Sequence, residues 1–209
     1  MGTALGCGFT DHDWQTQMEA AEQEMFAAVQ GLDMDKLMSR YVVNTVNGVD
    51  YAVRVHVYND VRKPTLLMTH GYAMASVFHA RMLPALAQHY RIVLFDNLSW
   101  GLNARSNNVG DALESPEKAE NWIVTWWHNL ITSLIETNSL PSKFYLSAHS
   151  AGGYQAMLYA SYHPEHIDAL FLQSPACAED TTRDGWVYDP YTIRLGDHDD
   201  SYPTREHVD

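Results

Sequence analysis

Short apolar runs alternate with longer stretches of helical periodicity along most of this chain. An apolar run of roughly four to eight residues is typical of a strand that is buried on both faces. Strands that alternate with helices after an opening hairpin predict a mostly parallel α/β sheet with helices on both faces. The predicted strands lie at 65–69, 91–95, 144–148 and 168–173, and the predicted helices at about 76–89, 116–138 and 152–163.

The opening hairpin is predicted at 41–58, where two β-rich runs flank the pair Asn47-Gly48. An Asn-Gly pair favours a tight turn because both of its residues must take positive φ. The first strand pair of the sheet is therefore expected to be antiparallel.

Two predicted helices carry apolar faces. We expect the helix at 116–137 to pack beneath the sheet, with a lipid-binding aromatic patch as the alternative. The helix within 14–38 is expected to pack its apolar face on the domain edge. The alternative is a helix lying on lipid, although its polar face carries Glu and Gln in place of Lys and Arg. The apolar residues are Trp122, Ile123, Trp126, Trp127, Leu130, Ile131, Leu134 and Ile135 in the first helix, and Trp14, Met18, Ala21, Met25, Val29 and Leu32 in the second.

The charge balance is acidic, with 13 basic and 26 acidic residues among 209, which gives a net charge of −13. Nucleic-acid binding needs a basic face, so this balance excludes nucleic acid as an expected partner, and it argues against attraction to anionic lipid. The length suffices for one domain with a substantial core. The segment 178–209 holds nine acids and three Arg, a net charge of −6, with little apolar periodicity. We interpret it as a loop-rich excursion.

Cys7 and Cys177 are the only cysteines, and they lie far apart in the sequence. Two such cysteines do not form a disulfide framework, which favours a reducing, cytoplasmic compartment. No segment has the length and apolarity of a membrane span or of a signal peptide. The histidines at 56, 79, 89 and 128 have no metal-ligand spacing, so neither a metal nor a cofactor is expected.

The stretch 143–153 ends a buried-strand run at a serine, Ser150, which small residues flank before a helix-like segment begins. Ala148 and Gly152, two residues before and after the serine, allow a sharp strand-to-helix turn that lifts the hydroxyl above the sheet. The same turn places the N–H of Ala151 at a helix N-terminus, where it can face a developing negative charge. The alternative is an ordinary turn in which the serine caps the helix.

Two further predicted strands end in polar residues. The run at 64–69 ends in His70-Gly71, and the run at 90–95 ends in Asp96-Asn97 before a loop at 98–108.

With these pieces in this order, the chain resembles the α/β-hydrolase superfamily. Within it the chain is most similar to the abhydrolase-domain 4/5 subfamily of lipid hydrolases and acyltransferases. The resemblance covers about 40–177, which leaves an N-terminal helical extension at 1–39 and the beginning of a lid at 178–209. It is carried by the segments THGYAMASVFHARMLPALA, FDNLSWG, LSAHSAGGYQAMLYASYHPEHIDALFLQSPA and YDPYTIRLGD.

The resemblance implies that Ser150 is the nucleophile and that the backbone N–H groups of Tyr72 and Ala151 form the oxyanion hole. It implies structural roles at the site for His70, Gly71, Asp96, His149 and Gly152. The loop after Asp96 departs from the family pattern, with Ser99 in place of a glycine and Asn103 in place of a serine, so its shape is in doubt.

A serine triad also needs an acid and a histidine, which in this family follow later strands. We expect the chain to stop in the lid, without the last two strands, so that the triad acid and base are unknown and lie outside it. Glu179, Asp180, His198 and His207 are the substitutes that the tail offers.

The implied function is serine-dependent hydrolysis of carboxylic esters of lipids, or acyl transfer, at low activity in this chain alone. The expected partner is a small-molecule ester or lipid, with peripheral contact to a lipid surface such as a lipid droplet. The alternatives are a non-catalytic protein that binds lipid or regulates a lipase, a serine peptidase of the proline-iminopeptidase kind, and an incomplete product of a longer gene.

Overall fold

The six strands of the computed structural model, which describes residues 12–59, 62–103 and 109–176, form one mixed sheet. Its order is β1-β2-β4-β3-β5-β6. The strands β3 (Thr65–Thr69), β4 (Arg91–Phe95), β5 (Phe144–His149) and β6 (Ile167–Gln173) run parallel, whereas β1 (Leu37–Val46) and β2 (Val49–Tyr58) are antiparallel to their neighbours. The α/β class, the mostly parallel sheet and the four predicted strand positions are confirmed.

The predicted hairpin is present, with β1 pairing β2 from Val46↔Val49 to Leu37↔Tyr58. Asn47 and Gly48 both have positive φ, 50° and 77°, as the sequence required. This tight turn fixes the register, and the register brings the buried residues of β2 alongside β4.

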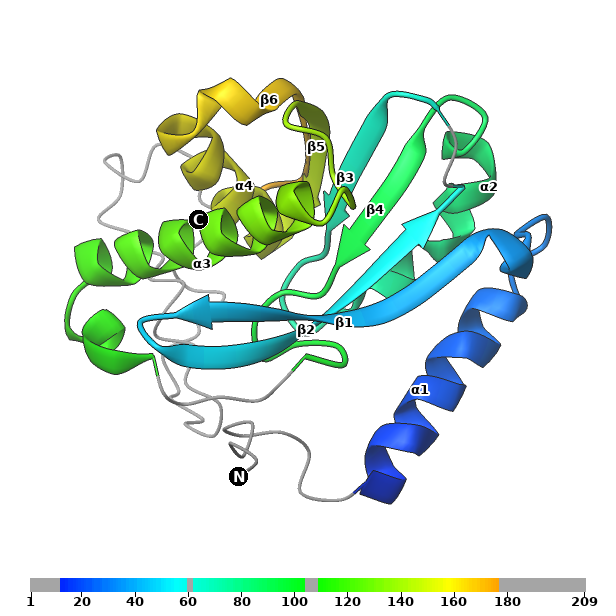
Figure 1. Ribbon diagram of the computed structural model, residues 1–209, viewed down its shortest axis with the longest axis horizontal. Coiled ribbons are helices and arrows are strands. Elements are labelled where there is room, and N and C mark those ends of the chain that lie inside the picture. The colour runs from blue at the N-terminus through cyan, green and yellow to red at the C-terminus, as the bar shows by residue number, and fades with distance from the viewer. Residues whose placement is uncertain (1–11, 60–61, 104–108, 177–209) are drawn as a thin grey trace, which may run out of the picture.

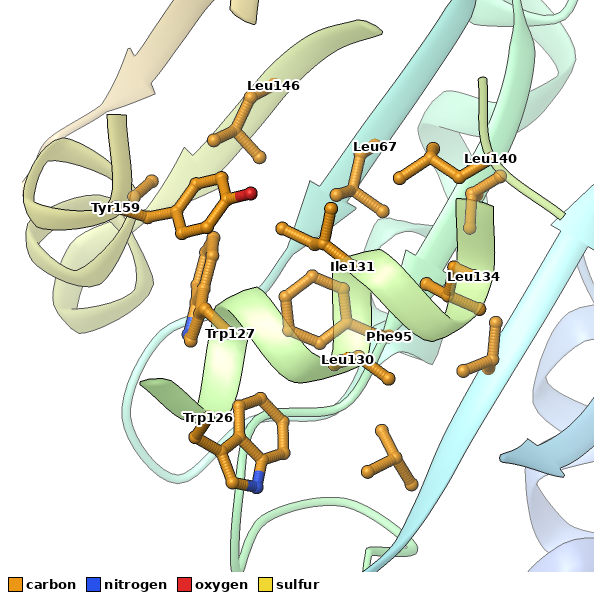
Figure 2. Close-up of a cluster of buried hydrophobic side chains, with 14 of the residues drawn as sticks. Leu67, Phe95, Trp126, Trp127, Leu130, Ile131, Leu134, Leu140, Leu146 and Tyr159 are labelled. Carbon is orange, nitrogen blue, oxygen red and sulfur yellow. The ribbon is translucent and has the colours of Figure 1, made fainter. Parts of the chain in front are cut away.

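One face of the sheet is covered by α3 (Pro116–Glu136) and α4 (Ser150–Tyr162), as Figure 1 shows. A Ser115 side chain that accepts a hydrogen bond from the Lys118 N–H begins α3. The apolar face of α3 is buried under the sheet, which confirms the core-facing prediction and not the lipid patch. Figure 2 shows its tryptophans against α4 and the strands; the cluster includes Leu67, Phe95, Trp126, Trp127, Leu130, Ile131, Leu134, Leu146 and Tyr159.

The other face is covered by α1 (His12–Ala27), η2 (Ser76–Met82) and α2 (Leu83–Leu86), which surround a second cluster that includes Phe26 and Leu83. The helix predicted at 76–89 is therefore mostly a 3-10 helix with only one short α-helical segment. Short 3-10 helices complete the chain at η1 (Met34–Lys36), η3 (Gly110–Glu114) and η4 (Pro164–His166).

The prediction for the face that α1 buries is wrong. The helix does lie on the sheet, but Trp14, Met18 and Met25 are exposed, while Glu22 and Phe26 are buried. The buried side of α1 is mostly polar because the sheet surface beneath it is polar. Specific charged and polar contacts join this side of the helix to the sheet, and Phe26 adds a buried apolar contact with the second cluster.

Those contacts form a buried cluster of Glu22, Arg54 and His56. Arg54 donates two hydrogen bonds to Glu22 Oε2, from Nε at 3.0 Å and from an η nitrogen at 2.6 Å. His56 Nε2 lies 3.2 Å from Glu22 Oε1, and the Arg54 guanidinium lies over the Tyr41 ring. Burial alone would raise the pKa of Glu22, but His56 and Arg54 together hold that pKa below its ordinary value.

Among the described residues, no helix combines the length and apolarity that crossing a bilayer requires.

Candidate active site

The predicted turn at Ser150 has the geometry that the sequence indicated. Strand β5 ends at His149, and α4 begins at Ser150, which takes φ of +51°. A non-glycine residue in the left-handed region is costly and persists only where its surroundings hold it, which is common at functional sites. Ser150 is half-buried and lies at the carboxyl edge of the sheet.

Gly152 is required because the first turn of α4 packs directly on the end of β3. A Cβ at Gly152 would lie 2.3 Å from the backbone oxygen of His70, closer than any real contact. Gly152 thus lets α4 approach the loop after β3, in addition to allowing the sharp turn at Ser150. Ala148, on the other side of the serine, is fully buried.

The loop after β3 lies against Ser150, as predicted. A Cβ at Gly71 would lie 2.8 Å from the Ser150 Cβ and 2.9 Å from Nδ1 of His149, so only glycine fits there. Tyr72 follows at once. Ala151 lies in the first turn of α4, where backbone N–H groups have no acceptor within the helix. The oxyanion-hole roles of Tyr72 and Ala151 stay predictions.

Asp96 is fully buried and holds two loops together. Its Oδ1 accepts the Ser76 N–H at 2.7 Å, and its Oδ2 accepts the Leu102 N–H at 2.8 Å. Gly101, with φ of +55°, passes so close that a Cβ there would lie 2.0 Å from Oδ2. Both carboxylate oxygens are thus used in positioning the loops that follow β3 and β4.

His70 links the same loops in its neutral form. Its Nε2 accepts the Asn97 N–H at 3.0 Å, so the proton must be on Nδ1, which donates to the Gly71 carbonyl at 2.7 Å. The Asn97 side chain donates to the His70 carbonyl at 2.7 Å. Burial lowers the pKa of His70, although Asp96, 3.7 Å away, acts in the opposite direction. These contacts support the structural role predicted for His70.

Asn103 is a site residue that the sequence analysis noticed only as a departure from a family pattern. Its side chain donates to the carbonyls of Asp96, at 2.5 Å, and Asn97, at 3.0 Å. It also accepts the Arg54 N–H at 2.6 Å, which connects the loop to β2. A buried amide can both donate and accept, as a serine hydroxyl can, but it reaches farther. The departure from the family pattern was therefore the signal that could have identified it.

No described residue stands as an obvious base for Ser150. His149 is adjacent in sequence, and its Nδ1 is buried without a hydrogen-bond partner in the part of the chain that the structure describes. His128, His163 and His166 gather elsewhere, with the rings of His128 and His163 stacked 4.1 Å apart between α3 and the end of α4. Glu179, Asp180, His198 and His207 lie outside the described residues, as do Cys7 and Cys177. Within residues 12–59, 62–103 and 109–176, no group of three or more candidate ligands could hold a metal ion.

His79, on η2 beneath these loops, is a second buried histidine. Burial lowers its pKa to about 4, with a further lowering from His70. The pKa of His128 is lowered as well, by burial and then by His163. The pKa values of His70, His79 and His128 are therefore all lowered. An unfolded histidine takes up a proton near pH 6.5, whereas these folded histidines take one up only at lower pH.

Stability is therefore expected to be full above about pH 6.5 and to fall as the pH drops toward 4. His79 alone should account for a loss of about 2 kcal/mol between about pH 7.5 and about pH 5. Urea unfolding of His79→Gln at both pH values should show a shallower loss than the unsubstituted chain. The matched control is His89→Gln, at an exposed histidine. If the free energy of unfolding falls equally with pH in the unsubstituted chain and in both variants, this account is contradicted.

Comparison with known proteins adds independent findings. A family model described as alpha/beta hydrolase fold matches residues 64–200. A probable 1-acylglycerol-3-phosphate O-acyltransferase from Oryza sativa subsp. japonica is 37% identical over 113 residues, which cover 54% of this chain and 25% of that protein. A 1-acylglycerol-3-phosphate O-acyltransferase from Arabidopsis thaliana is 35% identical over 126 residues, covering 59% of this chain and 28% of that protein. The matches thus span about a quarter of the length of these curated relatives.

Solved structures are similar in fold. Naproxen esterase (carboxylesterase NP) from Bacillus subtilis superposes with a TM-score of 0.61 at 16% identity, over 81% of this chain and 52% of the esterase. A putative lipase from Acinetobacter baumannii AYE gives a TM-score of 0.55 at 22% identity, over 86% of this chain and 54% of the lipase. At such identities the likeness shows the shared architecture.

Proposed function

The chain belongs to the alpha/beta hydrolase fold family, and on that premise we propose that it performs serine-dependent hydrolysis or transfer of acyl groups from carboxylic esters of lipids. The observation that carries the proposal is the backbone of Ser150 at φ +51°, with Gly71 packed on Ser150 and Gly152 packed on the backbone of His70. A turn that held a serine only for helix capping would need neither the strained φ nor two glycine-only contacts.

In the proposed mechanism Ser150 Oγ attacks the acyl carbon, and the carbonyl oxygen acquires negative charge. The N–H groups of Tyr72 and Ala151 would stabilise that charge, and losing one such donor typically costs ~10²–10³ in rate. The ester C–O bond then breaks, the departing alcohol takes up the proton that Ser150 gave up, and an acyl-serine remains. Water or a second alcohol attacks that acyl-serine, takes the acyl group and returns a proton to Ser150 Oγ. The names of the two plant relatives support a 1-acylglycerol-3-phosphate as a substrate, with its free hydroxyl as the acyl acceptor.

The base that activates Ser150 is not identified among the described residues, and we propose that this 209-residue chain alone has low activity. A serine without its base is a weak nucleophile, and losing the histidine of a comparable triad costs ~10⁶ in kcat. We also propose a cytoplasmic location with peripheral contact to lipid.

Covalent labelling by a fluorophosphonate tests the role of Ser150. Peptide mapping is expected to place the adduct on Ser150, and Ser150→Ala should abolish it. Ser161→Ala, at an exposed serine on the same helix, should leave it unchanged. No adduct on Ser150 at high probe concentration and alkaline pH, where a serine without a base still reacts through its alkoxide, would contradict the proposal and favour a non-catalytic binding protein.

The pH dependence of the labelling rate tests the missing base. Without a histidine base the rate should rise steadily with hydroxide concentration, because only the alkoxide reacts. With such a base the rate should level off above about pH 7, near the ordinary pKa of histidine. A plateau that disappears in His198→Ala or His207→Ala would show that the chain supplies its own base and would overturn the low-activity proposal.

A further inference from the structure

Two aromatic side chains meet at the carboxyl edge of the sheet, beside Ser150. The rings of Tyr72 and Trp100 pack edge to face with their centroids 4.6 Å apart. Tyr72 lies in the loop after β3 and is 41% exposed, and Trp100 lies in the loop after β4 and is partly buried. Such a pair gains about 0.5–1.5 kcal/mol beyond its burial, so it holds its geometry even where solvent reaches it.

Each ring extends from a loop whose backbone is fixed by buried contacts. Tyr72 directly follows Gly71, the residue packed on Ser150 and His149. The Trp100 N–H donates to the Asn97 carbonyl at 3.0 Å, and Asn97 in turn binds His70 through its backbone N–H and its side chain. The loops thus fix the backbone positions from which the two rings extend beside Ser150.

The loop segments that carry the pair are uncharged. The two segments, 71–76 and 97–103, contain no Lys, Arg, Asp or Glu. Asp96, which precedes the second segment, uses both of its oxygens within the loops, and His70 is neutral. Two partly exposed aromatic rings on uncharged loop segments suit an apolar chain, whereas a phosphate-bearing head group would need cationic donors.

We propose that Tyr72 and Trp100 form the wall that binds the acyl chain of the ester and thereby select for chain length. This inference rests on the proposed function, since it takes Ser150 as the point where the acyl carbon is held. The backbone N–H of Tyr72 would face the carbonyl oxygen, and its ring would contact the part of the acyl chain that lies beyond the first carbons. Trp100 extends the same surface.

The test measures binding without chemistry, in the Ser150→Ala background. Methyl alkyl ketones from 2-butanone to 2-decanone are the probes, because a ketone has the carbonyl of an ester but no leaving group. Affinity measured by calorimetry should rise with chain length, since each buried methylene contributes to binding. Adding Tyr72→Ala or Trp100→Ala should weaken 2-decanone binding about tenfold, a change of about 1.4 kcal/mol, and leave 2-butanone unchanged.

Three comparisons make the result decisive. Tyr72→Phe keeps the ring and should retain the affinity for the long ketone. Tyr162→Ala removes a 54% exposed aromatic at the far end of α4 and should change nothing. Thermal unfolding shows which variants are folded, and Tyr72→Leu and Trp100→Leu replace any that are not.

Two results would contradict the proposal that Tyr72 and Trp100 bind the acyl chain. One is that both aromatic variants bind 2-decanone with an affinity within twofold of that of Ser150→Ala alone. The other is that Ser150→Ala binds no ketone of any chain length. Neither result depends on whether Ser150 is a nucleophile, because the ketone assay lacks Ser150. Loss of fluorophosphonate labelling with intact ketone binding would instead contradict the proposed function and leave the acyl-binding wall supported.

Discussion

Replacing Arg54 with methionine is expected to lower the free energy of unfolding by up to about 3–5 kcal/mol, because the buried Glu22 carboxylate would lose both hydrogen bonds that Arg54 donates and keep only His56 beside it. Glu22 and Arg54 are each only 5% exposed, and two hydrogen bonds join them between α1 and β2. The substitution keeps most of the side-chain volume, so the loss reports the unpaired charge and not a cavity.

The double variant Glu22→Leu with Arg54→Met separates the charge from the packing. Removing both charges should recover most of the stability, since buried ion pairs are often replaced by apolar residues at little cost. Urea unfolding of the two single variants and the double variant gives the coupling free energy. Lys36→Met is the matched control, because its ion pair with Asp33 is exposed and such pairs contribute little.

A small effect would contradict this account of α1. If Arg54→Met costs less than about 1 kcal/mol, or if the double variant is as unstable as the sum of the single variants, the helix is held mainly by the apolar contacts of Phe26.

Replacing Gly152 with alanine is expected to displace the loop that carries His70 and Gly71, because the new Cβ would lie 2.3 Å from the His70 carbonyl oxygen. The atom it meets is backbone, so the strain cannot be relieved by a side-chain rotation. We expect a loss of about 1–3 kcal/mol in stability from overpacking. A shift of about 1 Å in the loop should also reduce the rate at which the fluorophosphonate labels Ser150, by a factor of about 10².

Gly153→Ala is the matched comparison. Its Cβ would meet Pro175, at 2.9 Å from that residue's Cβ, in the segment that follows β6. That variant should lose stability while the loop after β3 keeps its place, so its labelling rate should fall much less. Equal labelling of the Gly152→Ala variant and the unsubstituted chain would show that the loop after β3 is not part of the site.

Local patterns were sufficient for the elements that position the site. Asn47-Gly48 predicted a turn that the positive φ values confirm, and the apolar run before Ser150 predicted the strand β5 with α4 directly after it. Turn chemistry and side-chain periodicity act over a few residues, so they can be recognised in a single sequence. The resemblance also implied that the loop after β3 lies beside Ser150, and Gly71 is packed there.

Contacts between segments far apart in the chain explain the features that the sequence did not predict. The apolar residues of α1 predicted a buried face, yet the helix buries Glu22, because Arg54 and His56 of β2 line the surface beneath it. Asn103 gained its role from Arg54, 49 residues earlier in the chain. Pairings of this kind have no local signature, since each partner alone looks like an ordinary polar residue.

The amino-acid sequence by itself determined the order of strands and helices, the hairpin turn and the serine at the strand-to-helix turn, because each depends on neighbouring residues. The tertiary structure alone decided which face of α1 is buried, how closely Gly71 and Gly152 let the loop after β3 pack on the start of α4, and that Tyr72 meets Trp100. These features depend on desolvation, close packing and hydrogen bonds between residues far apart in the chain, which exist only once the sheet has formed.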